Sequence, residues 1–137
     1  MKLSVRTRYA VRILSELAAA PLSIGDLSEK TGISPRAVEQ ICARLRYDGI
    51  STGIAGPGGG IRLQVPLGDI SLGRLLDLFE GGVEFAVCCG DKANDCPNQS
   101  RCGNRAVWRE LSAKIQAELD AIPLDALLLH PARLKRV

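Results

Sequence analysis

A glycine-rich stretch, Ala55-Gly56-Pro57-Gly58-Gly59-Gly60, lies between two short segments, 50–55 and 61–65, that are predicted to be β-strands. Glycine adopts positive φ angles at little cost and lets the backbone approach a partner closely. The pattern therefore predicts a tight β-hairpin with an exposed tip. A phosphate-binding nucleotide loop is excluded, because such a loop ends in Lys-Ser or Lys-Thr and continues as a helix. Here Ile61-Arg62-Leu63 follows instead.

Two short helices are predicted directly before this hairpin. Ser23 is a suitable N-cap for the first, which ends near Thr31 because Gly32 follows. Ser34 and Pro35 begin the second helix, since proline is tolerated at the first helical position. The apolar face of the second helix has the spacing i, i+3, i+4, i+7 and consists of Val38, Ile41, Cys42 and Leu45. Two helices joined by a tight glycine turn and followed by a hairpin indicate a winged helix-turn-helix.

Further helices are predicted on both sides of this module. One amphipathic helix spans 6–19, and another spans Leu72–Glu80 behind the N-cap Ser71. Residues 81–103 show no apolar periodicity, so we expect a long loop there. A longer helix over 104–121 carries an apolar stripe of Trp108, Leu111, Ile115 and Leu119. We expect this stripe to form a dimer interface; packing onto its own domain is the alternative.

The predicted fold class is mainly α with a small β-wing, a winged helix-turn-helix plus a long C-terminal dimerisation helix. We expect a winged-helix DNA-binding domain over 1–80, a cysteine-rich loop over 81–103, and a dimerisation helix with its tail over 104–137. The length of 137 residues and the 46% of hydrophobic residues are sufficient for one globular core.

Charge and hydropathy narrow the classes of function. Residues 1–62 contain nine Lys and Arg against five Asp and Glu, a balance that suits a polyanionic partner such as double-stranded DNA. No apolar stretch approaches the ~20 residues needed to cross a bilayer, and the first residues lack the apolar run of a secretory signal. We therefore expect a cytoplasmic protein with no membrane partner. The single histidine, His130, has no catalytic neighbours in the sequence, which argues against an enzyme.

The exposed side of the second helix of the module carries side chains suited to reading DNA bases. Arginine pairs with guanine and glutamine with adenine in the major groove, which points to Arg36 and Gln40. Glu39 accepts from cytosine or repels wrong bases, and Arg6 is a candidate for phosphate contact. For each single residue the alternative is a solvated surface side chain. The complete candidate DNA-binding set is Arg6, Tyr9, Ser34, Arg36, Glu39, Gln40, Arg44, Gly56, Gly58, Gly59 and Arg62.

Four of the five cysteines lie within fifteen residues, namely Cys88, Cys89, Cys96 and Cys102. In a cytoplasmic chain this density favours metal binding or redox chemistry over structural disulfides. A zinc site usually contains Cys-x2–4-Cys pairs with a fourth ligand close by, and no such pair is present. Unligated or redox-active cysteines are the further alternative. Cys42 lies on the apolar face of its helix, so we expect it to pack in the core.

Short stretches along nearly the whole chain resemble one family of regulators. They are Arg8-Tyr9-Ala10-Val11, Ile33-Ser34, Val38-Glu39-Gln40-Ile41, Leu45-Arg46, Gly49-Ile50, Gly56-Pro57-Gly58-Gly59-Gly60, Arg62-Leu63, Cys96, Cys102 and Trp108-Arg109-Glu110-Leu111. The chain resembles the Rrf-type winged-helix transcription regulators, the family of IscR, NsrR, RirA and CymR. The resemblance implies a homodimer on operator DNA, with the second helix in the major groove and the wing in the minor groove. It also implies an iron–sulfur cluster on the loop cysteines.

The implied cluster agrees with the preference of iron–sulfur centres for thiolate ligands, and both 2Fe-2S and 4Fe-4S types stay open. Two positions where relatives supply a fourth ligand are occupied here by Arg105 and Arg8, neither of which can ligate iron. Other candidates for that ligand are Asp91, Asp95, Glu84, a small thiol and water. A further departure is Ala55, where relatives often carry an arginine before the wing. Its absence predicts weaker reading of the minor groove.

We expect the cluster to gate operator binding in response to iron, redox or nitric oxide status. Its gain or loss would reorder residues 81–103 and shift the dimer between DNA-competent and incompetent forms. Whether Cys88 or Cys89 is the ligand stays open. One alternative is a cluster-free regulator of the same fold, controlled by a partner protein or small molecule. Another is an electron carrier or cluster donor, which would not need the helix-turn-helix and wing.

Overall fold

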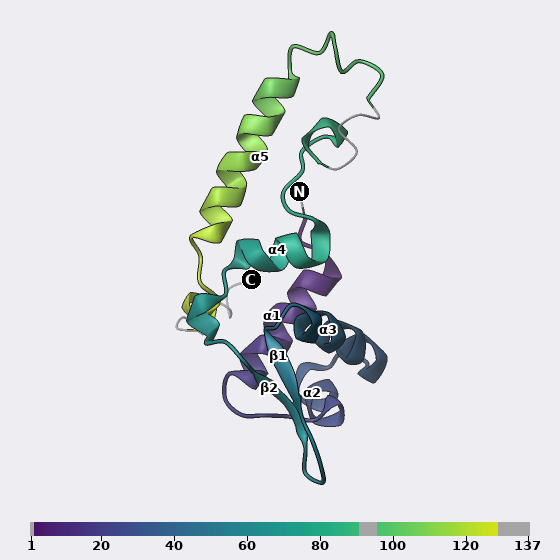
Figure 1. Ribbon diagram of the computed structural model, residues 1–137, viewed down its shortest axis with the longest axis vertical. Coiled ribbons are helices and arrows are strands. Elements are labelled where there is room, and N and C mark those ends of the chain that lie inside the picture. Colours follow the sequence, from purple (N-terminus) through teal and green to yellow (C-terminus); the bar gives the residue numbers. More distant parts are fainter. Residues whose placement is uncertain (1, 91–95, 129–137) are drawn as a thin grey trace.

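The computed structural model describes residues 2–90 and 96–128. Asp91, Asp95 and His130 lie outside this part of the chain. The elements in order are α1 (Val5–Leu17), α2 (Ile24–Thr31), α3 (Pro35–Tyr47), β1 (Ser51–Ile54), β2 (Gly60–Leu63), the 3-10 turn η1 (Leu67–Asp69), α4 (Leu72–Glu80), the 3-10 turn η2 (Val87–Cys89), α5 (Arg105–Asp120) and α6 (Leu124–Leu128). The molecule is elongated, with the β-hairpin at one end and residues 96–104, which precede α5, at the other (Figure 1).

Serine N-caps fix the start of the four helices of the winged module. In each case the serine Oγ accepts a hydrogen bond from the backbone N–H three residues later, at 3.0 to 3.3 Å. The four caps are Ser4, Ser23, Ser34 and Ser71. Such a cap is worth about 1 kcal/mol. This local chemistry explains why the helix starts were predictable: the helix expected over 6–19 is observed as Val5–Leu17, and Leu72–Glu80 is observed with the expected bounds.

The core forms where α1, α2, α3 and α4 meet. The predicted apolar face of α3, from Val38 to Leu45, is buried as expected. Leu27 of α2 and Leu75 of α4 are fully enclosed with it. From α1 the core receives Ala10, Ile13, Leu14 and Leu17. Fully burying one Leu or Ile side chain contributes about 1.5–3 kcal/mol, so this cluster holds the module together.

The hairpin contains an edge pairing that the sequence pattern did not predict. Strands β1 and β2 pair antiparallel, with Ser51 opposite Leu63 and Ile54 opposite Gly60. Leu22, in the connection between α1 and α2, adds to the other edge of β2 through two hydrogen bonds with Ile61, at 3.0 and 2.8 Å. These bonds hold the base of the wing against the helix-turn-helix.

The C-terminal part returns to the winged module. Helix α5 stands beside the loop segment that contains η2 (Figure 1) and packs against η2 and α4. After α5 the backbone of Leu72 donates to Ile122 at 2.9 Å, and that of Leu124 donates to Ile70 at 2.8 Å. Leu124 is 2% exposed and belongs to the main core. The segment over 122–128 thus packs onto the winged module, although it lies within the stretch 104–137 expected to form a separate unit.

Candidate functional site

The outer face of α3 presents the predicted base-reading residues to solvent. Arg36, Glu39 and Gln40 are all exposed, while the opposite face of the helix is buried. The hydroxyl of Ser34 accepts from Ala37 N–H at 3.3 Å and caps the helix. Helix α3 is therefore fixed along its inner side, and its outer side chains are free to meet a ligand.

A surface pocket of about 620 Å³ lies where α1 meets α3. It brings together four of the residues predicted from sequence, Arg6, Tyr9, Gln40 and Arg44. Its apolar lining includes Ile41, Leu78 and Phe79. Basic, phenolic and amide groups at one opening can hold a phosphate and the edge of a base together. Sequence spacing alone did not show that residues of α1 and α3 share a pocket.

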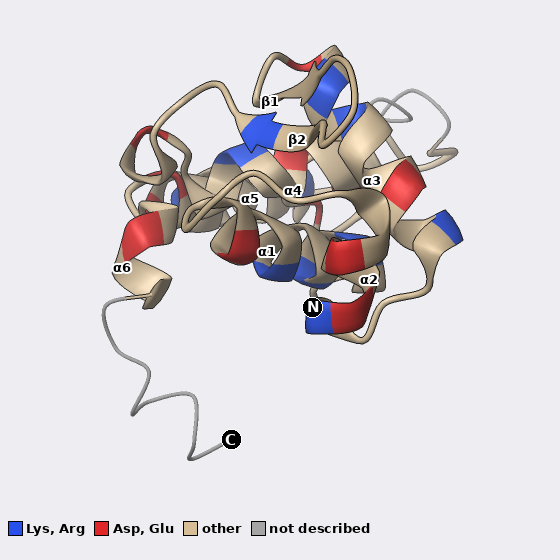
Figure 2. Cartoon of the chain, turned by 90° about the horizontal axis from the view of Figure 1, so that it is seen from below, with Lys and Arg blue, Asp and Glu red and all other residues tan. Residues whose placement is uncertain are grey.

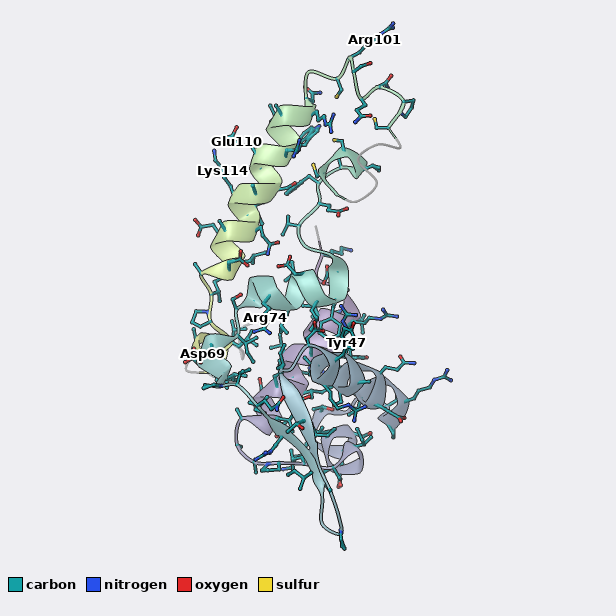
Figure 3. All side chains as sticks on the ribbon, viewed as in Figure 1. Tyr47, Asp69, Arg74, Arg101, Glu110 and Lys114 are labelled. Atoms are coloured by element: carbon teal, nitrogen blue, oxygen red, sulfur yellow. The ribbon has the colours of Figure 1, made fainter. Side chains whose placement is uncertain are left out.

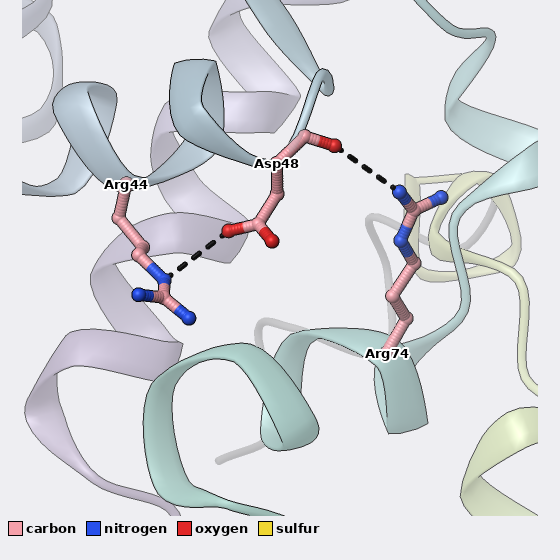
Figure 4. Close-up of polar contacts among 3 residues, drawn as sticks. All are labelled: Arg44, Asp48 and Arg74. Atoms are coloured by element: carbon pink, nitrogen blue, oxygen red, sulfur yellow. Dashed lines mark hydrogen bonds and ion pairs between the residues drawn. The ribbon is translucent and has the colours of Figure 1, made fainter.

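Arg44 is held by neighbours at the end of α3. Its Nε lies 3.2 Å from Asp48 Oδ2, and its guanidinium lies 5.6 Å from the centroid of the Tyr47 ring. The carbonyl oxygen of Asp48 also accepts from Arg74 Nη2 at 3.4 Å, which links α3 to α4 (Figure 4). Tyr47, labelled in Figure 3, is 83% exposed and was not among the predicted site residues. The signal in the sequence was an aromatic residue at the last position of α3.

The wing tip is a tight turn that requires glycine. The N–H of Gly59 bonds the carbonyl of Gly56 at 3.0 Å, with Pro57 and Gly58 between them. Gly58 has φ +72°, the left-handed value that the third position of a type II turn demands. A Cβ on Gly59 would overlap the carbonyl oxygen of Ile54. The tip thus exposes backbone that no side chain covers.

Charges on the wing side are mixed rather than of one sign. Viewed from below, basic and acidic segments are interspersed over α1, α2 and α3 (Figure 2). Arg62 is exposed on β2 and lines a depression that also includes Pro21 and Gln64, separate from the pocket of Arg6. Contact with a polyanion therefore depends on the positions of individual arginines.

The cysteines of the loop differ in their exposure. Cys88 is buried, Cys89 and Cys96 are half-buried, Cys102 is exposed, and all four thiols are free. Burial and the neighbouring Cys89 raise the pKa of Cys88, and Cys102 is close enough to contribute in the same direction. Burial also acts to raise the pKa of Cys89, but hydrogen bonds with the Ser112 hydroxyl and with the backbone outweigh it and lower that pKa.

Two polar residues of α5 fasten the start of the cysteine loop. The Ser112 hydroxyl accepts from the N–H of Phe85 at 3.3 Å and donates to the Trp108 carbonyl at 2.8 Å. Gln116 Oε1 accepts from the N–H of Val83 at 3.1 Å, and its Nε2 donates to the carbonyl of Gly73 in α4 at 3.4 Å. The loop, α4 and α5 are thus joined through two side chains that the sequence analysis did not identify.

The free thiols of the loop are of the chemical type that a thiolate-bound metal group requires. Besides the four free thiols, Arg105 at the start of α5 has an Nε that is inaccessible to water and has no hydrogen-bond partner among residues 2–90 and 96–128. Over residues 2–90 and 96–128, no three Cys, His, Asp or Glu side chains are grouped as for a metal ion. Of the other fourth-ligand positions considered, Glu84 and Arg8 are exposed.

Helix α5 carries an exposed apolar side. Val107 is 57% exposed, Trp108 38% and Leu111 37%, and Val87 of η2 is 57% exposed. Ser112 is the only buried residue of the sixteen in α5. Of the predicted stripe, Trp108 and Leu111 are therefore partly exposed within one chain, and Ile115 and Leu119 are half-buried.

Comparison with known proteins decides the family. A family model described as an iron-dependent transcriptional regulator, Rrf2, matches residues 3–130. The chain belongs to the Rrf2 family of transcription regulators. The HTH-type transcriptional regulator IscR of Aliivibrio salmonicida is 34% identical over 133 residues, covering 94% of this chain and 78% of the relative. A member of this family is a transcription regulator and not an enzyme.

Solved structures confirm the winged-helix fold of this Rrf2 regulator. The structure of T. potens IscR superposes with a TM-score of 0.71 at 26% identity, over 93% of this chain and 86% of that one. The structure of CymR, the global cysteine regulator of B. subtilis, superposes with a TM-score of 0.73 at 24% identity, over 93% of this chain and 95% of that one. In the part of the Rrf2 chain that is described, no helix is both long and apolar enough to cross a membrane.

Proposed function

We propose that this Rrf2 regulator binds operator DNA through α3 and the wing, and that an iron–sulfur cluster on the loop cysteines gates this binding. The observation that carries the proposal is the placement of two kinds of site in opposite halves of one molecule. Helix α3 and the glycine wing lie in one half of the molecule, and the described part of the cysteine loop lies in the other half (Figure 1). The candidate base-reading side chains of α3 are exposed. Such a regulator would work in the cytoplasm, where its operator is.

In the DNA complex, α3 would enter the major groove with Arg36, Glu39 and Gln40 facing the bases. Arg6, Tyr9 and Arg44 would hold phosphates around the shared pocket. The exposed backbone of Gly56 and Gly58, with the half-buried Gly59 next to them, would approach the minor groove, and Arg62 would lie beside it. Replacing Arg36 or Gln40 by alanine should cost about 1–3 kcal/mol in operator affinity. Replacing Arg6 should weaken binding to all sequences and reduce the salt dependence.

The cluster would be held by thiolates of Cys96, Cys102 and one or both of Cys88 and Cys89, as a 2Fe-2S or 4Fe-4S group. When bound, it would supply a centre that reacts with oxygen or nitric oxide, or is lost when iron is scarce. Since Cys102 is exposed and Cys88 buried, binding at both would draw the loop inward. That movement would act on the residues that Ser112 and Gln116 hold.

The second copy in the dimer would cover the exposed apolar side of α5. A homodimer formed through Val107, Trp108 and Leu111 presents two α3 helices, as a two-fold symmetric operator requires. Burying such residues contributes roughly 25 cal/mol for each Å² of apolar surface, so the exposed side is a reason to dimerise.

The decisive experiment is purification under strictly anaerobic conditions, followed by absorbance, iron and sulfide analysis and operator binding with and without the cluster. A triple serine variant at Cys89, Cys96 and Cys102 should lose both the colour and the regulated binding. The matched control is Cys42→Ser, since Cys42 is buried in the winged module. A triple variant that keeps colour and regulation would refute the proposal.

A cluster-free regulator controlled through the same loop is the second candidate. It is favoured by the four free thiols, one of them exposed, which are open to a small molecule or a partner protein. A colourless, metal-free dimer that binds its operator after anaerobic purification would support this candidate instead.

A further inference from the structure

Tyr47, the last residue of α3, is 83% exposed, more than any other large hydrophobic side chain in the described part of the chain. An aromatic side chain ordinarily contributes to a fold by burying its large apolar surface, and Tyr47 buries little of it. The contact of its ring is with Arg44, whose guanidinium carbon lies 5.6 Å from the ring centroid. This distance is within the range of a cation–π interaction. Tyr47 therefore acts on a surface arginine rather than on the core.

Arg44 is restrained from two sides. Tyr47 follows it by three residues and Asp48 by four, so both lie next to it on the surface of the helix end. Arg44 Nε forms an ion pair with Asp48 Oδ2 at 3.2 Å. That oxygen is inaccessible to water and accepts no hydrogen bond in the described part of the chain, so the nearby guanidinium compensates its charge. Ring and carboxylate together limit the rotation of a side chain that is otherwise exposed and flexible.

The restrained guanidinium still has donors to offer. Its two terminal nitrogens lie on the side away from Asp48 (Figure 4). Among the residues that the structure describes, neither terminal nitrogen has a hydrogen-bond partner. Arg44 also lines the pocket that contains Arg6, Tyr9 and Gln40. The planar fork of an arginine matches the oxygens of a phosphate, so these donors suit a phosphate at the opening of the pocket.

We propose that Tyr47 is a positioning residue that holds Arg44 beside this pocket, ready to bind one phosphate of the DNA backbone. This inference rests on the DNA-binding part of the proposed function and does not depend on a cluster. Ordering a free arginine side chain on binding costs conformational entropy, and a side chain that is already restrained loses less. The aromatic face of Tyr47 supplies the restraint, so its hydroxyl is not required. Because a phosphate contact carries no base information, the gain applies to every duplex.

The test measures fluorescence anisotropy with a fluorescein-labelled duplex of random sequence at low salt, so no operator is needed. The variants are Tyr47→Phe, Tyr47→Ala, Arg44→Ala and the double alanine variant, which form a double-mutant cycle. The control cycle combines Tyr47→Ala with Arg46→Ala. Arg46 is exposed, lies next to Tyr47 in the sequence and does not line the pocket. Circular dichroism checks folding, which we expect to be unchanged because Tyr47 is mostly exposed.

Arg44→Ala should weaken binding about tenfold and reduce the salt dependence by about one phosphate contact. Tyr47→Ala should weaken binding about two- to fivefold, the range of a cation–π contact at an exposed site, and Tyr47→Phe should not weaken it. The loss caused by Tyr47→Ala should disappear when Arg44 is already alanine. It should persist in full when Arg46 is alanine instead.

The possible failures are distinguishable. The positioning role is overturned if Tyr47→Ala costs nothing, if its cost persists without Arg44, or if Tyr47→Phe costs as much. The last two results would mean that Tyr47 contacts DNA by itself. In all three cases the unmodified protein still binds DNA, and the proposed function stands. If the unmodified protein does not bind the duplex even at low salt, the proposed function fails and this inference fails with it.

Discussion

Replacement of Glu80 by glutamine should weaken the joint between α1 and α4. Glu80 Oε1 accepts from the N–H of Ser4 at 2.8 Å and from the Thr7 hydroxyl at 2.5 Å. Burial acts to raise the pKa of Glu80, but the hydrogen bonds from Thr7 and Ser4 outweigh it and lower that pKa. The carboxylate is thus charged at neutral pH and ties the first turn of α1 to the last residue of α4.

The size of the effect follows from these two bonds. A hydrogen bond to a charged group is worth about 1.5–3 kcal/mol net. Glutamine keeps one acceptor oxygen but no charge, and Glu80 is only half-buried. We therefore expect Glu80→Gln to lower the free energy of unfolding by about 1–2 kcal/mol at pH 7. For a chain of this length that corresponds to a fall in Tm of roughly 3–6 °C.

The loss must depend on pH in a defined direction. A carboxyl whose pKa is lowered in the folded state stabilises above its unfolded pKa of about 4.3 and loses that contribution as the pH falls through the folded value. The difference in Tm between the two proteins should therefore be full at pH 7 and clearly smaller at pH 3. Thermal unfolding followed by circular dichroism measures it, with exposed Glu118→Gln as the control. A difference that is absent at pH 7, or equal at both pH values, would refute the reasoning.

Three further outcomes are expected. Gly59→Ala should distort the wing and lower operator affinity in fluorescence anisotropy, whereas Gly53→Ala, which meets no neighbour within 4 Å, should not. Because burial raises the pKa of Cys42 to about 11, iodoacetamide at pH 8 should leave it unmodified in the folded protein and modify it after unfolding, as peptide mass spectrometry would show. Ala55→Arg should raise affinity for sites with a narrow A·T-rich minor groove; unchanged affinity and base preference would contradict this.

The sequence allowed accurate prediction of elements that depend on local chemistry. Ser23, Ser34 and Ser71 were identifiable as caps because an N-cap acts on the backbone only three residues away. Leu124 returns to the core, and Leu22 adds to the edge of β2. Both contacts join segments that are far apart in the sequence. No local periodicity reports such pairings, so neither of them was predicted.

The site was predictable to a similar degree. The outer face of α3 follows directly from its apolar inner face, which explains why Arg36 and Gln40 could be located. Ser112 and Gln116 were not predicted, because the prediction for α5 rested on its apolar stripe and assigned that stripe to a dimer interface. The available signal was a serine four residues after Trp108, beside that stripe. A polar residue at that position indicates a buried hydrogen bond rather than an apolar packing contact.

These polar contacts make α4 the element through which the two ends of the molecule can influence each other. Gln116 ties the beginning of α4 to the loop through Gly73 and Val83. Glu80 ties the end of α4 to the first turn of α1, next to the pocket that Arg6 lines. A cluster can change operator affinity only by stabilising one arrangement of these contacts over another. Because hydrogen bonds hold both ends of α4, we expect a shift of the loop to be transmitted to α1 through the whole helix.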